Sequence, residues 1–345
     1  MHQQFIPSAP TYLSDIDEKC VRDLLYKKGL PRGIHETILE TIKQVPIRFI
    51  IADDSGSMNT NDGHRLAVRG HTTKVVSCSR WTELIEGLKF HAELANTANA
   101  LTEFRFLNGH DPILVGLPFD SGSGFHEAMT TFSTLSPNGR TPLCRQIQAV
   151  IDSIKTMEPN LRANGQSVVL TIATDGESTD GNIADALKPL ENLPVLVVIR
   201  LCTDAEDVVN YWNNVDAELE LALDVLDDLH GEAGEVSEFN KWLTYGEPLH
   251  HLREFGMTLK EFDLLDETKL SYDQMRLMCA LFVGDGYASE LPDPTIDWQA
   301  FYNAVDDRVK VNDMTYCPRK DRMRPWINMK QLSRAYGPHE GCVVS

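Results

Sequence analysis

The stretch that decides the fold runs from Ile47 to Asn61 and has the sequence IRFIIADDSGSMNTN. It opens with an apolar, β-rich run, residues 47–51, which is too short for a helix and is typical of a buried strand. The run stops at Asp53, and Ser55 and Ser57 follow at alternate positions. In a tight loop these residues can direct one carboxylate and two hydroxyls to one point, and such hard oxygen donors suit a Mg²⁺-type cation.

Asp-x-Ser-x-Ser after a buried strand resembles the metal-ion-dependent adhesion site of von Willebrand factor type A domains. In that family a threonine from a second loop and an aspartate from a third loop complete the site. Here Gly139–Leu143 resembles the threonine loop, and Ile172–Glu177 resembles the strand end that carries the aspartate. The resemblance implies Mg²⁺ as the cofactor, with Mn²⁺ or Ca²⁺ as alternatives. The ligands that it implies, directly or through water, are Asp53, Ser55, Ser57, Thr141 and Asp175.

The order of expected elements predicts an α/β fold with a doubly wound, mostly parallel central sheet. Strands that alternate with helices form parallel sheets covered on both faces. The Asn108-Gly109 turn between the runs 104–107 and 113–115 indicates a hairpin, and therefore one antiparallel edge strand. Sites in such sheets form beyond the carboxyl ends of the strands. Since Asp53 and Asp175 both end expected parallel strands, the topology alone places them at one edge.

The chain divides into four expected segments. Residues 1–45 form a helical N-terminal extension, expected as a helical pair packed on the main domain. Residues 46–243 form the type A domain, within which the polar stretch 59–79 is expected to be irregular. Residues 244–318 form a helical annex, which is either a second domain or a wrapper on the first, and its His250-His251 pair is expected at the surface. Residues 319–345 form a basic C-terminal tail.

Composition narrows the class of protein. The 345-residue chain has a formal net charge of −19, which disfavours nucleic acid as a partner because phosphate binding needs a basic surface. Seven scattered cysteines without a Cys-x-x-Cys pair indicate reduced thiols. No secretory signal or membrane-length apolar run is visible. These features together favour a cytoplasmic location.

The C-terminal end carries a separate signal. Its last four residues are Cys342-Val343-Val344-Ser345, the pattern for farnesylation of Cys342. A single lipid chain binds membranes weakly, and nearby basic residues supply a second attraction. We therefore expect peripheral association with the cytoplasmic face of a membrane through this tail. The alternative is a solvated tail with an accidental cysteine.

These patterns favour a non-enzymatic, metal-dependent protein-binding module, an adaptor whose cation takes an exposed Asp or Glu of a protein partner. The alternative is a metal-dependent enzyme acting on phosphate or a similar anion. Against it, phosphotransferases place a second aspartate where this chain has Ser55, and no general base is positioned by the sequence. A third hypothesis is that the metal only joins three loops.

Overall fold

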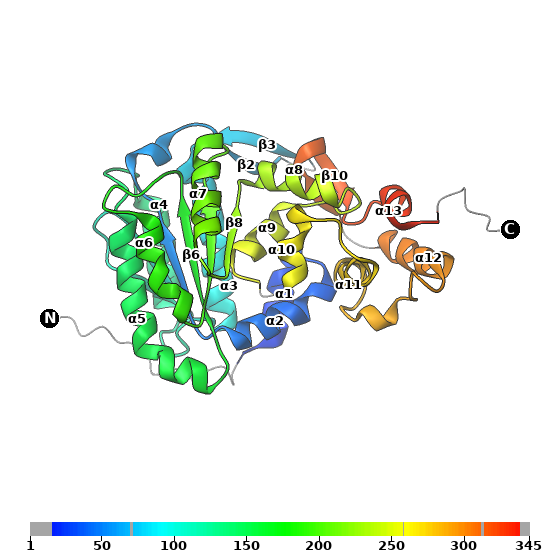
Figure 1. Cartoon of the computed structure of the whole chain (residues 1–345), viewed down its shortest axis with the longest axis horizontal. Helices are drawn as coiled ribbons and strands as arrows, with labels where there is room; N and C mark the ends of the chain where they lie inside the picture. The colour runs from blue at the N-terminus through cyan, green and yellow to red at the C-terminus, as the bar shows by residue number, and fades with distance from the viewer. Residues whose placement is uncertain (1–15, 70–71, 258, 312–313, 339–345) are drawn as a thin grey trace.

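The computed structural model describes residues 16–69, 72–257, 259–311 and 314–338. Its centre is a six-stranded sheet in the order β5-β4-β1-β6-β7-β8 (Figure 1). All neighbouring strands are parallel except β4 and β5, so β5 is an antiparallel edge strand. The strands are β1 (Arg48–Ala52), β4 (Thr102–Phe106), β5 (Ile113–Val115), β6 (Val168–Thr174), β7 (Val195–Leu201) and β8 (Leu223–Leu226). The fold is therefore doubly wound α/β, of the von Willebrand factor A or Rossmann type, as the sequence predicted.

Alternate strand residues face opposite sides, and helices cover both faces. Phe49, Leu170 and Val197 lie in one core cluster, whereas Ile50 and Phe104 lie in another on the opposite face. The helices against the first cluster are α5 (Leu143–Ala163), α6 (Ile183–Leu187) and α7 (Glu206–Glu218). The helices against the second are α3 (Arg80–Ala98) and α4 (Ser123–Thr134). Burial on both faces explains why the central strands are predominantly apolar.

The expectation of an irregular segment at residues 59–79 is wrong. Residues Gly63–Arg69 (β2) and Thr72–Cys78 (β3) pair as an antiparallel hairpin outside the main sheet. The hairpin packs along α3 and also contacts β10. The Val75 amide donates a hydrogen bond to the Tyr316 hydroxyl at 3.3 Å. This hairpin therefore links the sheet domain to the C-terminal part of the chain.

Helices from both ends of the chain form one layer with a common core. Val21 and Ile38 near the N-terminus share a cluster with Leu249, Phe282 and many later residues. These helices are α1 (Glu18–Lys27), α2 (His35–Gln44), α8 (Leu229–Phe239), α9 (Glu247–Glu254), α10 (Lys260–Glu267), α11 (Tyr272–Val283), α12 (Trp298–Val309) and α13 (Met329–Tyr336). Residues 244–318 thus pack in the same layer as the N-terminal helices.

The expected tail is largely folded within the described part of the chain. Strands β9 (Met314–Cys317) and β10 (Arg322–Pro325) form a second small hairpin, and α13 follows. Trp326, Ile327 and Leu332 are buried in the common helical core. Residues 339–345, and with them the expected lipidation site Cys342, lie outside the described residues. No helix in the described ranges has both the length and the apolar character that a membrane crossing requires.

The expectation that His250 and His251 lie at the surface is wrong. His250 is 1% exposed, and the His251 ring is 3.0 Å from the Glu254 carboxylate. Glu254 also contacts His91 at 3.0 Å and accepts a hydrogen bond from Arg200 Nε at 3.0 Å. Burial alone would raise the pKa of Glu254, but the contacts with His251 and His91 hold it well below its usual value. This cluster joins α9 to α3 and β7.

Candidate metal centre

The first expected ligand, Asp53, extends the ladder of the central strand β1. Its amide donates to Ala173 O of β6 at 2.9 Å, and its side chain is fully buried. Asp53 Oδ1 accepts from the Ser55 amide at 2.8 Å, and Oδ2 accepts from the Thr174 hydroxyl at 2.7 Å. Burial raises the pKa of Asp53 to about 6, although hydrogen bonds from Ser55 and Thr174 oppose this rise. The Asp53 carboxylate is therefore fixed in position by two loops.

The two serines connect Asp53 to Asp175. Ser55 Oγ lies 3.0 Å from Ser57 Oγ, and Ser57 Oγ donates to Asp175 Oδ1 at 2.8 Å. Ser55 is 2% exposed, whereas Ser57 is exposed to solvent. Asp175 follows β6 directly and is 5% exposed. A continuous chain of contacts through the exposed residue Ser57 thus links the first and third expected loops.

Thr141 lies in the second expected loop, which contacts both of the others. Its carbonyl accepts from the Thr179 amide of the third loop at 2.9 Å. The Gly56 amide of the first loop donates to Gly139 O at 3.2 Å. Thr141 is 8% exposed, and its hydroxyl forms no hydrogen bond to any residue that the structure describes. The structure therefore brings the loop of Thr141 to the site, while its hydroxyl forms no hydrogen bond to Asp53, Ser57 or Asp175.

Asp54, to which the sequence assigned no role, positions the same loops. Asp54 Oδ1 accepts from the amides of Leu107 and Asn108 at 2.9 and 3.0 Å and from Asn108 Nδ2 at 3.0 Å. Asn108 Nδ2 also donates to Arg140 O at 2.9 Å. Asn108 thereby joins the first loop to the second. The only sequence signal at Asn108 was its Asn-Gly turn, which predicted a hairpin and not a loop contact.

Arg80, at the start of α3, is the second residue that sequence reasoning missed. Its guanidinium donates to Asp175 Oδ2 at 2.9 Å and forms an ion pair with Asp62 as well. The Arg80 side chain is 13% exposed. Asp175 therefore already has a cationic partner, and the two carboxylates at the site are only partly balanced. No local pattern around residue 80 indicates this contact across 95 residues of sequence.

The donor set fits a hard divalent cation. Asp53, Ser55, Ser57 and Asp175 supply carboxylate and hydroxyl oxygens at the carboxyl edge of the sheet, and the Thr141 hydroxyl is free to join them. No cysteine or histidine takes part in the contacts between these residues, so the set does not favour a softer metal such as zinc. The two carboxylates and the one neighbouring guanidinium together carry a net negative charge, which favours binding of one dication.

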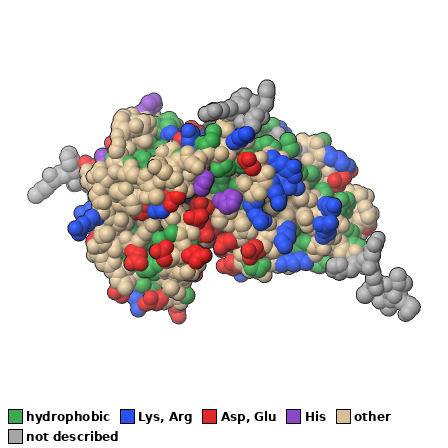
Figure 2. Space-filling model, turned by 90° about the horizontal axis from the view of Figure 1, so that it is seen from above, with side chains coloured by type: hydrophobic (Ala, Val, Ile, Leu, Met, Phe, Trp, Pro, Cys, Tyr) green, Lys and Arg blue, Asp and Glu red, His purple; other side chains and the backbone are tan. Residues whose placement is uncertain are grey.

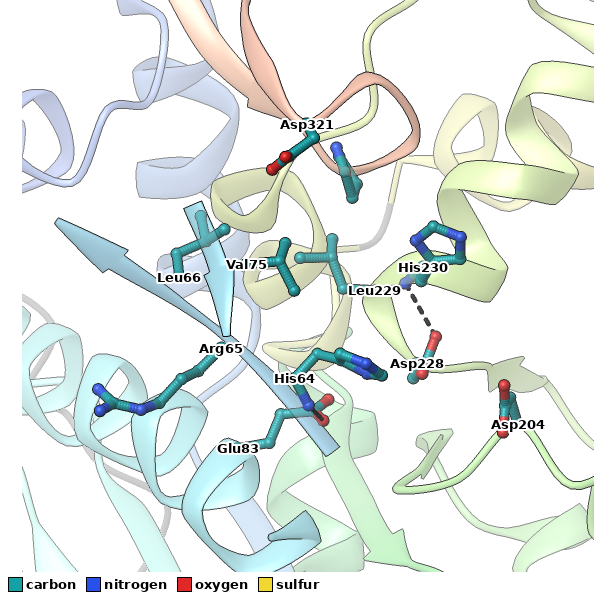
Figure 3. A pocket seen from close by; sticks show the side chains of 11 residues that line it. His64, Arg65, Leu66, Val75, Glu83, Asp204, Asp228, Leu229, His230 and Asp321 are labelled. Carbon is teal, nitrogen blue, oxygen red and sulfur yellow. Dashed lines mark hydrogen bonds between the residues drawn. The ribbon is translucent and has the colours of Figure 1, made fainter. Parts of the chain in front are cut away.

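A cavity of about 370 Å³ lies at the same edge of the sheet, where Asp204 follows β7 and Asp228 follows β8 (Figure 3). The Cys202 amide at the end of β7 donates to Thr174 O at 2.8 Å, and Asp204, two residues later, lines the cavity. Glu83 also lines it, one turn along α3 from Arg80. The walls combine the apolar side chains of Leu66, Val75, Leu229 and Pro318 with the carboxylates of Glu83, Asp204, Asp228 and Asp321. The Arg65 side chain extends away from the other labelled residues.

Comparisons with known proteins add little to this geometry. No family model matches the chain, and no curated protein sequence matches it. Among solved structures, the chain is similar to the conserved hypothetical protein BatB from Bacteroides thetaiotaomicron, with 18% sequence identity and a TM-score of 0.32. The alignment covers 45% of this chain and 65% of that chain. Because this likeness is low, the fold assignment is based on strand order and direction alone.

Proposed function

We propose that the protein is a metal-dependent protein-binding module. Asp53, Ser55, Ser57 and Thr141 would hold Mg²⁺, directly or through water, with Asp175 acting directly or through Ser57. A bound dication at this edge would supply a Lewis-acidic position for the Asp or Glu carboxylate of a protein partner. Mn²⁺ or Ca²⁺ could occupy the same oxygen donors.

The observation that carries this proposal is the meeting of three loops at one edge of the sheet. Each pair of loops is joined by at least one hydrogen bond: Ser57 to Asp175, Gly56 to Gly139, and Thr179 to Thr141. These loops come from chain positions more than thirty residues apart, yet they gather oxygen donors around the exposed Ser57. An arrangement that gathers ligands but keeps one side open to solvent supports binding of an outside carboxylate.

The charges around the site support a partner with an acidic group. The Arg80 guanidinium offsets part of the charge of Asp175, so the protein itself neutralises a dication incompletely. A cation with few anionic protein ligands attracts a further carboxylate more strongly. The 370 Å³ cavity at the same edge of the sheet has apolar side chains in its lining and offers a place for a further side chain of the partner.

Magnesium binding is tested first, by isothermal titration of chelator-treated protein. We expect wild type to bind Mg²⁺ and Asp53→Ala to bind it at least about tenfold more weakly, since Asp53 is the buried carboxylate on which the loop is built. Asp307→Ala is the matched control, because the Asp307 side chain is 80% exposed and lies on α12, in the helical layer. Equal affinities in all three proteins would refute the metal site.

Partner binding is tested separately, by selecting peptides from a random library in Mg²⁺ and again in chelator. We expect Mg²⁺-dependent clones to share an Asp or Glu, and replacement of that residue by Asn or Gln to abolish binding. If Mg²⁺ binds but selects no peptide, the metal only joins the loops. In that case Asp53→Ala should lower the melting temperature and leave the set of bound partners unchanged.

We further propose that the C-terminal end attaches the module to a membrane through a lipid on Cys342. The support is the terminal sequence itself together with the basic residues that precede it. The intact mass of protein made in a eukaryotic cell tests this. Loss of the last three residues with the added mass of a prenyl group is the expected result, and an unmodified full-length end rejects it.

A further inference from the structure

A second cavity, far along the chain from the loops of the metal site, has the opposite charge character. It measures about 240 Å³ and lies between α8, the segment that follows it, and the β9–β10 hairpin with the start of α13. Lys241, Arg319, Lys320 and Arg324 line it, and no Asp or Glu does. This is unusual in a chain whose formal net charge is −19. In Figure 2, Lys and Arg side chains gather over the half of the molecule that holds the C-terminal helices (Figure 2).

The four cations of this cavity are not neutralised by the protein. None of them forms an ion pair with a carboxylate in the described part of the chain, although Arg319 donates a hydrogen bond to the Ser237 hydroxyl. Elsewhere on the molecule, most arginines near the core have acidic partners, as Arg80, Arg200 and Arg253 do. Unpaired cations around one small space repel one another, and a bound anion would relieve this repulsion.

The cavity is built on fixed backbone. The Thr244 amide donates to Trp326 O at 2.8 Å, and the Asn328 amide donates to Trp242 O at 2.7 Å. The Thr244 hydroxyl donates to Pro325 O at 2.8 Å. Buried Leu243, Thr244 and Tyr245 form its floor. The basic side chains therefore project from a rigid wall and not from a loose tail, which lowers the ordering cost of binding.

Neutral donors and a helix end complete the lining. Asn328 caps the eight-residue helix α13, and Asn328 and Gln331 both line the cavity, so the N-terminus of α13 borders it. Helix N-termini carry partial positive charge and favour anions. Arginine adds paired N–H donors that match phosphate oxygens. The chemistry of the whole lining therefore favours phosphate oxygens.

We propose that this cavity binds a ligand that carries two phosphate groups. A phosphate monoester has a charge of about −1.5 to −2 at neutral pH, so two of them balance the four cations. The shared chemistry is a pair of phosphates on a small scaffold, either a free metabolite or the headgroup of a phosphorylated lipid. This inference is independent of the metal-dependent function, because the two sites share no residue.

Binding is tested with full-length protein made in bacteria, titrated with inorganic pyrophosphate and with soluble inositol trisphosphate. The test variant is Lys241→Gln/Lys320→Gln, which removes two exposed cations from the lining. The matched control is Arg322→Gln/Lys330→Gln, which removes two exposed cations that do not line the cavity. We expect the test variant to weaken binding at least about tenfold and the control to retain it. Arg324→Gln supplies a second, single-site test.

Two results would overturn the proposal: no binding of either phosphate compound to wild type, or equal weakening in the test and control variants, which would indicate diffuse surface charge. Vesicle sedimentation distinguishes the two sources. Binding to phosphatidylinositol bisphosphate vesicles, but not to phosphatidylserine vesicles of equal charge, assigns the lipid headgroup. Binding of the soluble compounds without vesicle binding assigns a free metabolite.

Discussion

At the scale of single residues, the candidate metal centre depends on side chains that carry no metal-binding pattern. The serine motif indicated Asp53, Ser55 and Ser57 because a strand and its loop are local. Asp54 and Asn108 hold the loops together from positions 54 residues apart, and no local sequence pattern reports such a contact. The candidate ligands on one loop could thus be proposed from sequence, whereas the residues that hold the loops together could not.

Replacement of Gly139 by alanine would test how tightly the loops are packed. Its φ is +87°, and a Cβ there would lie 2.6 Å from Asn108 Oδ1. We expect Gly139→Ala to lower the free energy of unfolding by about 2–4 kcal/mol, through backbone strain and the clash with Asn108. Gly165→Ala is the control, since Gly165 also has positive φ, +61°, but nothing within 4 Å. Urea denaturation measures both, and equal losses would show that Asn108 is not a tight contact.

Replacement of Arg80 by a neutral residue would test the charge balance at the candidate metal site. Its guanidinium lies 2.9 Å from Asp175 and would stand close to a bound dication. Since like charges repel, we expect Arg80→Gln to tighten Mg²⁺ binding roughly three- to tenfold, about 1 kcal/mol. Isothermal titration measures this. Weaker binding would instead show that Arg80 is needed chiefly to orient Asp175.

At the scale of elements, the central strands were predictable and the β2–β3 hairpin was not. β1, β6 and β7 are covered on both faces, so their sequences are predominantly apolar. β2 lies against α3 and β3 contacts β10, both outside the main sheet, and Val68 is 71% exposed. An outlying hairpin with one half-covered face has little apolar periodicity, which is why its sequence resembled a loop.

Two carboxyl groups in and just before helix α8 should make stability depend on pH. Burial raises the pKa of Glu235 to about 7 and that of Asp227 to about 6, and neighbouring carboxylates add to both shifts. Unfolded glutamate titrates near 4.3, so between about pH 4.5 and 7 the folded state binds more protons than the unfolded state. The contribution of these two carboxyl groups to the free energy of unfolding therefore falls as the pH rises through this window.

Glu235→Gln should remove this loss. We expect the variant to be more stable than wild type by about 0.5–1 kcal/mol at pH 8, allowing for screening of a partly exposed side chain, and unchanged at pH 4.5. Thermal unfolding across this range measures the difference. Glu127→Gln, on an exposed face of α4, should show no such trend. A pH-independent gain would assign the effect to something other than titration of Glu235.

At the scale of the whole molecule, the sheet domain is not separable from the helices that flank it. Phe90 and Leu94 of α3 are buried in the core that α1, α2 and α9 complete. Arg48, in β1, donates to Phe255 O at 3.1 Å and to Val45 O at 3.3 Å. The sequence-based segments group only residues that are consecutive in the chain. A shared core is formed by contacts between distant segments, so it could not be predicted from the segment boundaries.

A fragment of residues 46–243 should therefore fold poorly. It would expose Phe90, Leu94 and their neighbours, each worth about 1.5–3 kcal/mol when buried. We expect it to aggregate or to bind a hydrophobic dye, whereas residues 16–338 should unfold cooperatively. Circular dichroism and dye fluorescence distinguish the behaviour of the two fragments. A soluble, cooperatively folding fragment would show that the helical layer is dispensable.

The common helical layer also sets the order of events during synthesis on the ribosome. The apolar faces of α1 and α2 emerge first, yet partners such as Leu249, Met278 and Phe282 are translated more than two hundred residues later. Until then the nascent chain exposes apolar surface to the chaperones and proteases of the cell. Expression yield in a cell should accordingly depend on chaperone supply more strongly than the stability of the finished protein suggests.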